Sequence, residues 1–196
     1  MKNKLILLRH GESIWNLENK FTGWTDIDLS KNGENEAEKA GILLSNYNVE
    51  IDFVYVSYLK RAIKTYRICL KQLKKGVGET IYHWRLNERH YGNLQGLNKS
   101  ETAKKYGDKK VLMWRRSYDI PPPKLDLNDK RHPKYDALYK DIDPKDLPDS
   151  ESLKDTLKRV NPLWVNQIVS HLKNGKNIMI VAHGNSLRAI VKNLKK

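Results

Sequence analysis

Cysteine is nearly absent from this sequence, in which Cys69 is the only one among 196 residues. A single thiol cannot form a disulfide within the chain, and it cannot supply a cysteine-rich metal site. Long apolar runs are missing as well, and none approaches the ~20 residues that a membrane-spanning helix needs. The basic start MKNKLILL has too short an apolar stretch for a signal peptide, because Arg9 ends it. These absences predict a cytoplasmic protein without a membrane partner.

Acidic residues are scarce relative to basic ones, with 23 Asp and Glu against 37 Lys and Arg and a net charge of +14. A chain of this charge attracts polyanions, which include nucleic acid, anionic membranes and small phosphorylated metabolites. The lysines are scattered, so a generally basic surface explains the composition equally well. No nucleic-acid-binding module and no run of mixed aromatic and basic residues is present, and we predict no nucleic-acid partner.

Short apolar segments alternate with helical patterns along the chain. Strands are predicted at 5–8, 52–56, 81–84 and 177–182. Helices are predicted at 31–46, 59–73, 101–116 with a break near Gly107, 152–172 and 186–194. This alternation predicts an α/β fold, a three-layer α/β/α arrangement with a mostly parallel central sheet and helices on both faces. The length fits a single domain over 1–196.

Two sequence signals mark helix starts, and one segment breaks the alternation. Ser30 is a predicted N-cap, and Ser152 with Asp155 has the spacing of a capping box. Residues 119–150 hold six of the seven prolines and show little periodicity. A loop of that length inside a compact domain is usually functional or mobile.

The first and last predicted strands end alike, LILL in RHGES and IMIVA in HGNSL. Each places a His-Gly pair, His10-Gly11 or His183-Gly184, at the carboxyl edge of a strand, where ligands bind in open α/β sheets. Glycine allows the backbone to approach a ligand closely. A helix that begins near Ser186 would offer free amide groups to an anion.

Two histidines beside Arg9 suggest phosphate chemistry. An imidazole that is neutral at one nitrogen can attack phosphorus and carry the phosphoryl group. Arginine suits phosphate because its planar fork donates hydrogen bonds in pairs. No convincing group of metal ligands is present, so side chains must supply the positive charge. A single histidine at a strand end is more often a surface or capping residue, and the hypothesis depends on the joint pattern.

The stretch RHGESIWN is similar to the signature of the histidine phosphatase superfamily, an Arg-His-Gly after the first strand. Further segments, in the same order, resemble the cofactor-dependent phosphoglycerate mutases: FTGWTDIDLSKNGENEA (21–37), YVSYLKRAIKT (55–65), WRLNERHYGNLQGLNKSETAKKYGD (84–108), WRRSYDIPPP (114–123) and VAHGNSLRAIVK (181–192). The similarity covers nearly the whole chain, and the set is far more specific than any single motif.

This resemblance implies a role for each matching residue. His10 would be the nucleophile and Glu88 the general acid/base for the substrate hydroxyl, while Arg9, Arg61 and His183 would hold the transferring phosphoryl group. The remaining implied ligands are Asn16 and the backbone at Gly184 and Asn185 as donors, Thr22 and Gly23 at the floor, and Tyr91, Lys99, Arg115 and Arg116 around the carboxylate or second phosphate.

Structural alternatives remain for these residues. Arg115 and Arg116 could be a solvated helix end, Lys99 plain surface, and Glu88 the partner of Arg85 or Arg89. We expect a second set to be core, structural or surface residues: Trp24, Trp84, Trp114, Trp164, His83, His90, His132, His171 and Cys69.

The resemblance implies a glycolytic and gluconeogenic enzyme that interconverts 3-phosphoglycerate and 2-phosphoglycerate. It would be primed by 2,3-bisphosphoglycerate, need no metal, and form a homodimer or homotetramer. The family also has a further C-terminal segment, with another strand and a tail over the site, beyond the counterpart of SLRAIVK. Either this sequence is only part of the protein, or the protein is short, in which case the missing closure would favour hydrolysis over transfer. The alternatives are a bisphosphoglycerate synthase or phosphatase, or a general phosphomonoesterase, on the same site, an inactive relative, and a polyanion-binding protein.

Overall fold

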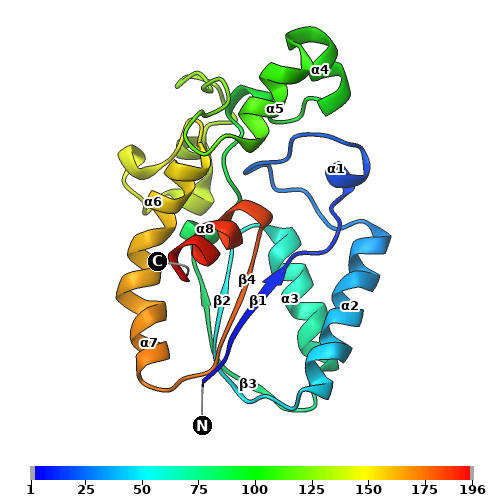
Figure 1. The fold of residues 1–196 in the computed structure, drawn as a ribbon, viewed down its shortest axis with the longest axis vertical. Coiled ribbons are helices and arrows are strands. Elements are labelled where there is room, and N and C mark those ends of the chain that lie inside the picture. The colour runs from blue at the N-terminus through cyan, green and yellow to red at the C-terminus, as the bar shows by residue number, and fades with distance from the viewer. Residues whose placement is uncertain (1–2, 195–196) are drawn as a thin grey trace.

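A computed structural model describes residues 3–194 of the protein, and at its centre is a four-stranded sheet (Figure 1). The strands are β1 (Leu5–Arg9), β2 (Ile51–Val56), β3 (Val77–Tyr82) and β4 (Ile178–Ala182), in the order β1-β4-β2-β3. Every pairing in this sheet is parallel. β4 is buried along its whole length, as expected for an apolar strand that is covered on both faces. The predicted mostly parallel sheet is confirmed.

Helices cover both faces of the sheet (Figure 1). On one face α3 (Lys60–Gln72) packs on the sheet, with α2 (Lys31–Asn46) against it. The other face carries α6 (Leu153–Leu163), α7 (Val169–Lys173) and α8 (Gly184–Leu194). Side chains of β4 alternate between the two cores: Ile178 and Ile180 join the α6–α8 side, whereas Met179 and Val181 join the α3 side. The predicted three-layer arrangement is therefore present.

Most predicted helices are confirmed, together with their caps. The Ser30 hydroxyl accepts the Gly33 N–H, and Ser152 with Asp155 forms the predicted capping box. The 101–116 pattern is two helices, α4 (Lys99–Tyr106) and α5 (Asp108–Arg116), which meet at Gly107 with φ of 87°. The 152–172 helix continues from α6 to α7 through a π-helical segment, Trp164–Ile168, just after Pro162.

Three local predictions were wrong or incomplete. The third strand begins at Val77, not at 81, and ends at Tyr82, because the His83 side chain accepts the Arg85 N–H and starts a 3₁₀ turn, Trp84–Leu86. α8 begins at Gly184 and not near Ser186. The short helix α1 (Ile14–Leu17) was not predicted.

The proline-rich segment 119–150 is an ordered excursion that contains three 3₁₀ turns, Pro133–Tyr135, Ala137–Tyr139 and Pro144–Asp146. Tyr139 and Leu147 anchor it in an apolar cluster with Trp24 and Trp84. Through this cluster the segment packs at the carboxyl end of the sheet, where α4 and α5 also lie (Figure 1). Over residues 3–194, no helix is both long and apolar enough to cross a bilayer.

Candidate active site

A cavity of about 350 Å³ lies at the carboxyl edge of the sheet. All the predicted site residues except His183 line it, and Lys20, Phe21 and Arg188 line it as well. Seven of the lining side chains are Lys or Arg, and Glu88 is the one acidic residue among them. A cavity with this balance fits a small ligand that carries several negative charges.

A larger hollow, of about 1370 Å³, lies between α6 and the end of the proline-rich segment. Its lining mixes acidic residues such as Asp146 and Asp149 with basic ones such as Lys154 and Lys158. None of the predicted site residues borders it. Its size alone does not make it a candidate site, and the smaller cationic cavity is the one with convergent chemistry.

His10 is buried just after the carboxyl end of β1 and is held as a neutral imidazole. Its Nδ1 lies 2.6 Å from the Gly11 carbonyl oxygen, which can only accept, so Nδ1 carries the ring proton. Nε2 is then the nitrogen with the free lone pair. Burial, and next the positive charge of Arg61, lower the pKa of His10 to about 3. At neutral pH the ring is therefore unprotonated at Nε2, as a nucleophile must be.

The backbone next to His10 is fixed by close contacts. The His10 N–H donates to the Ala182 carbonyl at 3.0 Å, which continues the β1–β4 pairing by one residue. The Gly11 N–H donates to the Thr65 hydroxyl at 3.1 Å. A Cβ on Gly11 would overlap the Gly33 backbone on α2, so only glycine allows this approach. Together these contacts set the carbonyl that orients the His10 ring.

His183 lies directly behind His10, with 4.8 Å between the ring centroids. Its Nε2 is 2.8 Å from the Ser57 hydroxyl. The Asn87 Oδ1 accepts the Tyr58 N–H at 3.1 Å and also the Ser57 hydroxyl at 2.9 Å, so the Ser57 oxygen is left to accept the Nε2 proton. Nδ1 of His183 then has a lone pair and no hydrogen-bond partner within residues 3–194. Burial, with Arg61 next, holds the pKa of His183 well below its usual value.

Arg61 binds backbone carbonyls at the floor of the cavity and also brings a positive charge there. Its guanidinium is 1% exposed and donates to the Thr25 carbonyl at 3.0 Å and the Gly23 carbonyl at 2.8 Å. Its Nε is buried without a partner in the described chain. Burial lowers the pKa of Arg61 to about 10, which leaves it charged at neutral pH. Arg61 therefore fixes the floor of the cavity and keeps one donor free for an anion.

Glu88 is held by its carboxylate at the start of α8. Its Oε1 accepts the Arg89 N–H at 2.8 Å and the Asn185 N–H at 3.1 Å. The prediction that the first amides of this helix are free for an anion was therefore wrong for Asn185. A Cβ on Gly184 would lie 3.9 Å from both Glu88 Oε2 and Arg9 Nε, so this oxygen and the Arg9 head lie beside Gly184.

The alternative that Glu88 pairs with a neighbouring arginine has no support in the described chain. Arg85 pairs with Asp146 at 3.7 Å. Arg89 donates to the Arg115 carbonyl at 3.1 Å and lies over the Tyr91 ring. Glu88 is thus a carboxylate with one oxygen fixed by two backbone donors and with the other beside Gly184.

The far side of the cavity is built by α4 and α5. Lys99 begins α4, and Arg115 and Arg116 end α5. Burial and the charge of Arg115 lower the pKa of Lys99. The Thr22 Oγ1 is buried without a partner in residues 3–194. Asn16 accepts the Ser13 N–H with its Oδ1, and this leaves its amide NH₂ as the donor that can reach a ligand.

Other sequence-based expectations concern the core. The four tryptophans expected in the core, Trp24, Trp84, Trp114 and Trp164, are each at most 7% exposed, and Cys69 is buried. Ser57 and Asn87, which set the His183 tautomer, were missed, and so were Lys20 and Arg188. Ser57 and Asn87 carry no sequence signal of their role, whereas Arg188 stands five residues after His183 on a helix that begins at the site.

The fold and the cationic cavity fit an enzyme that handles phosphoryl groups, and the chain belongs to the histidine phosphatase superfamily (branch 1). The model of that family matches residues 5–129 and 122–196. Two bacterial relatives identify the group more narrowly. The chain is 53% identical, over 98% of its length and 77% of the relative, to the 2,3-bisphosphoglycerate-dependent phosphoglycerate mutase 2 of Bacteroides thetaiotaomicron. It is 54% identical, over 97% and 77%, to the 2,3-bisphosphoglycerate-dependent phosphoglycerate mutase of Parabacteroides distasonis.

The fold also matches a solved structure of this kind. A mycobacterial glucosyl-3-phosphoglycerate phosphatase in complex with VO3 superimposes with a TM-score of 0.71, at 23% identity, over 98% of this chain and 81% of that one. At this identity the likeness supports the fold and not the substrate.

Proposed function

We propose that this chain interconverts 3-phosphoglycerate and 2-phosphoglycerate, with 2,3-bisphosphoglycerate as the primer. The observation that carries the proposal is the neutral His10, with its free Nε2 at a cavity that seven cationic side chains line. At 53% identity, the function in the name of the Bacteroides relative supports this substrate class. We therefore assign the chain to the phosphoglycerate isomerases and not to the polyanion-binding proteins.

The priming bisphosphate fits the residues of the cavity. Arg61 Nε and Thr22 Oγ1 are buried donors without partners in residues 3–194, and such groups are costly unless a ligand meets them. Arg115, Arg116 and Lys99 lie on the other side. The cavity thus offers donors for one phosphate near His10 and a second anionic group at α4 and α5.

In the proposed mechanism His10 carries the phosphoryl group and Glu88 moves the proton. In the first half, Glu88 takes the proton of the substrate hydroxyl as that oxygen attacks phosphorus and the bond from phosphorus to Nε2 of His10 breaks. In the second half, Nε2 attacks the other phosphate of the 2,3-bisphosphoglycerate formed in the first half, and Glu88 returns the proton to the leaving oxygen. Arg9 and Arg61 stabilise the charge on the phosphoryl oxygens.

A coupled assay for 2-phosphoglycerate, run with and without 2,3-bisphosphoglycerate while released phosphate is followed, tests this proposal. We expect isomerisation that rises with the bisphosphate. His10→Ala should abolish both turnover and the acid-labile phosphohistidine. Glu88→Gln should reduce turnover by about 10²- to 10⁴-fold and also slow phosphorylation of His10 by 2,3-bisphosphoglycerate, because Glu88 is the acid in that step.

Phosphate release without isomerisation would favour the alternative, a bisphosphoglycerate phosphatase or general phosphomonoesterase on the same site. Full turnover in Glu88→Gln would remove Glu88 as the acid/base. We also expect a homodimer or homotetramer, which light scattering measures, and a cytoplasmic location.

A further inference from the structure

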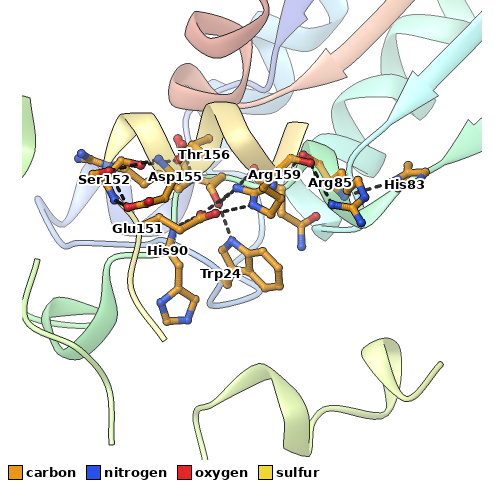
Figure 2. Close-up of polar contacts among 12 residues, drawn as sticks. Trp24, His83, Arg85, His90, Glu151, Ser152, Asp155, Thr156 and Arg159 are labelled. Atoms are coloured by element: carbon orange, nitrogen blue, oxygen red, sulfur yellow. Dashed lines mark hydrogen bonds and ion pairs between the residues drawn. The ribbon is translucent and has the colours of Figure 1, made fainter. Parts of the chain in front are cut away.

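A buried ion pair between Glu151 and Arg159 takes no part in the proposed chemistry (Figure 2). Arg159 is on α6, and Glu151 stands just before the Ser152 cap of that helix. Arg159 Nε is 2.6 Å from Glu151 Oε1, and its Nη2 is 2.9 Å from Oε2. The two residues are 6% and 2% exposed. Such a pair is weak evidence for stability, because desolvation offsets the attraction between its charges.

The same guanidinium holds the chain segment that carries Glu88. Its Nη1 donates to the Arg85 carbonyl at 2.7 Å, and its Nη2 lies 3.1 Å from the carbonyls of both Asn87 and Glu88. Glu151 Oε2 also accepts the His90 N–H at 2.9 Å. The ion pair therefore contacts four backbone groups between residues 85 and 90, all by hydrogen bonds.

A tryptophan completes this support from the side of the cavity floor. The Trp24 indole N–H donates to the Glu88 carbonyl at 2.5 Å, and the Arg159 guanidinium lies 5.3 Å from the centre of its ring. Trp24 follows Gly23, whose carbonyl Arg61 holds. The Glu88 peptide is thus fixed from behind by Arg159 and Trp24, while its carboxylate is fixed in front by the amides of Arg89 and Asn185.

We propose that the Glu151–Arg159 pair is a positioning device for Glu88, which sets where its carboxylate meets the substrate hydroxyl. This inference rests on the proposed function, in which Glu88 moves the proton. Only an arginine can bind a carboxylate through two nitrogens and still reach several carbonyls with one planar group. Neither Glu151 nor Arg159 lines the cationic cavity, so both act through Glu88 and not on the substrate.

The test is Arg159→Lys, which keeps the positive charge and removes the planar guanidinium that makes several hydrogen bonds at once. We expect kcat for 3-phosphoglycerate to fall by roughly 10- to 100-fold, because a displacement of about 1 Å at a reacting group costs that much. KM should stay within about threefold, since Arg115, Arg116 and Lys99 remain in place. Glu151→Gln should lower kcat in the same way, and thermal melts of both variants monitor folding. Arg131→Lys, at an arginine that binds Asp129 and the Gln95 carbonyl, is the matched control and should keep its kcat.

The decisive measurement places Arg159→Lys in the Glu88→Gln background. If Arg159 acts through Glu88, the double variant should be no more than about twofold slower than Glu88→Gln, because contacting residues that act as one unit are not additive. A full additional loss, or a rise in KM at constant kcat, would overturn the positioning role alone. Undiminished turnover in Glu88→Gln itself would instead overturn the acid/base assignment, and the inference with it.

Discussion

Gly33→Ala tests the contact that orients His10. Gly33 is in the first turn of α2, and its N–H meets the Ser30 cap. A Cβ there would lie 2.7 Å from the Glu12 nitrogen and 2.8 Å from its carbonyl carbon, and it would overlap the Glu12 oxygen. All three are backbone atoms, so no rotamer change relieves the clash. To reach an ordinary 3.4 Å contact, the Glu12 nitrogen must separate from the new Cβ by about 0.7 Å, and the overlapped Glu12 oxygen must move further still.

Two opposing effects set the magnitude. Overpacking of a rigid contact costs about 1–3 kcal/mol, whereas alanine in place of glycine in a helix gains at most about 1 kcal/mol. We expect a net loss of about 1–2 kcal/mol, which for a chain of this size is a Tm lower by roughly 2–8 °C. Glu12 follows Gly11, whose carbonyl holds His10 Nδ1. The displacement should therefore slow phosphorylation of His10 by about 10-fold or more.

The assay combines denaturant unfolding with single-turnover phosphorylation of His10 by 2,3-bisphosphoglycerate. Gly76→Ala is the control, because a Cβ at Gly76 meets nothing within 4 Å; we expect its stability to change by no more than about 0.5 kcal/mol. A Gly33→Ala protein that is at least as stable as the parent and forms phosphohistidine at the parent rate would refute the reasoning, since the clash would then neither outweigh the gain in helix propensity nor reach His10.

Two further predictions concern the histidines. The pKa of His10 and of His90 is lowered to about 3 and that of His183 is lowered well below 6.5, by burial in each case. Below pH 6.5 the unfolded chain therefore binds protons that the folded chain does not. The free energy of unfolding should fall as the pH drops from about 6.5 toward 3, and each such histidine adds about 1.4 kcal/mol per pH unit to the slope. Urea unfolding at pH 7.5 and pH 5.0 measures this, and equal stabilities would contradict it. Ser57→Ala removes the acceptor of the His183 Nε2 proton, which costs about 1–3 kcal/mol and frees the other tautomer. Phosphohistidine formation should slow, and an unchanged single-turnover rate would show that the tautomer does not matter.

The meeting of the two His-Gly pairs was predictable from the sequence, because parallel strands end at one edge of a sheet. The structure makes β1 and β4 neighbours, although 168 residues of chain lie between the end of β1 and the start of β4. The helix starts at Ser30 and Ser152 were predictable too, since caps are local signals. The third strand was misplaced because its polar start, Val77 to Thr80, lacks an apolar pattern.

The supports of the site were not predictable, since each depends on the path of distant segments. Ser57 reaches His183 only because β2 lies beside β4. Glu151 stands next to a predicted cap, but its contacts form only because Arg159 and residues 85–90 lie at the same buried place in the fold. Periodicity describes which face of an element is apolar; it does not say which buried polar groups will find one another.

The electrostatics of the site serve binding and chemistry together. Arg61 lies close enough to both histidines to lower their pKa values, and it also keeps a free Nε in the cavity. The positive charge that fits a phosphate therefore also adds to the effect of burial in keeping the His10 ring unprotonated. A phosphoryl group at the site would partly neutralise that charge, and linkage requires the pKa of His183 to rise when it binds. The Nδ1 lone pair of His183, which has no partner within residues 3–194, is the one that would take up this proton.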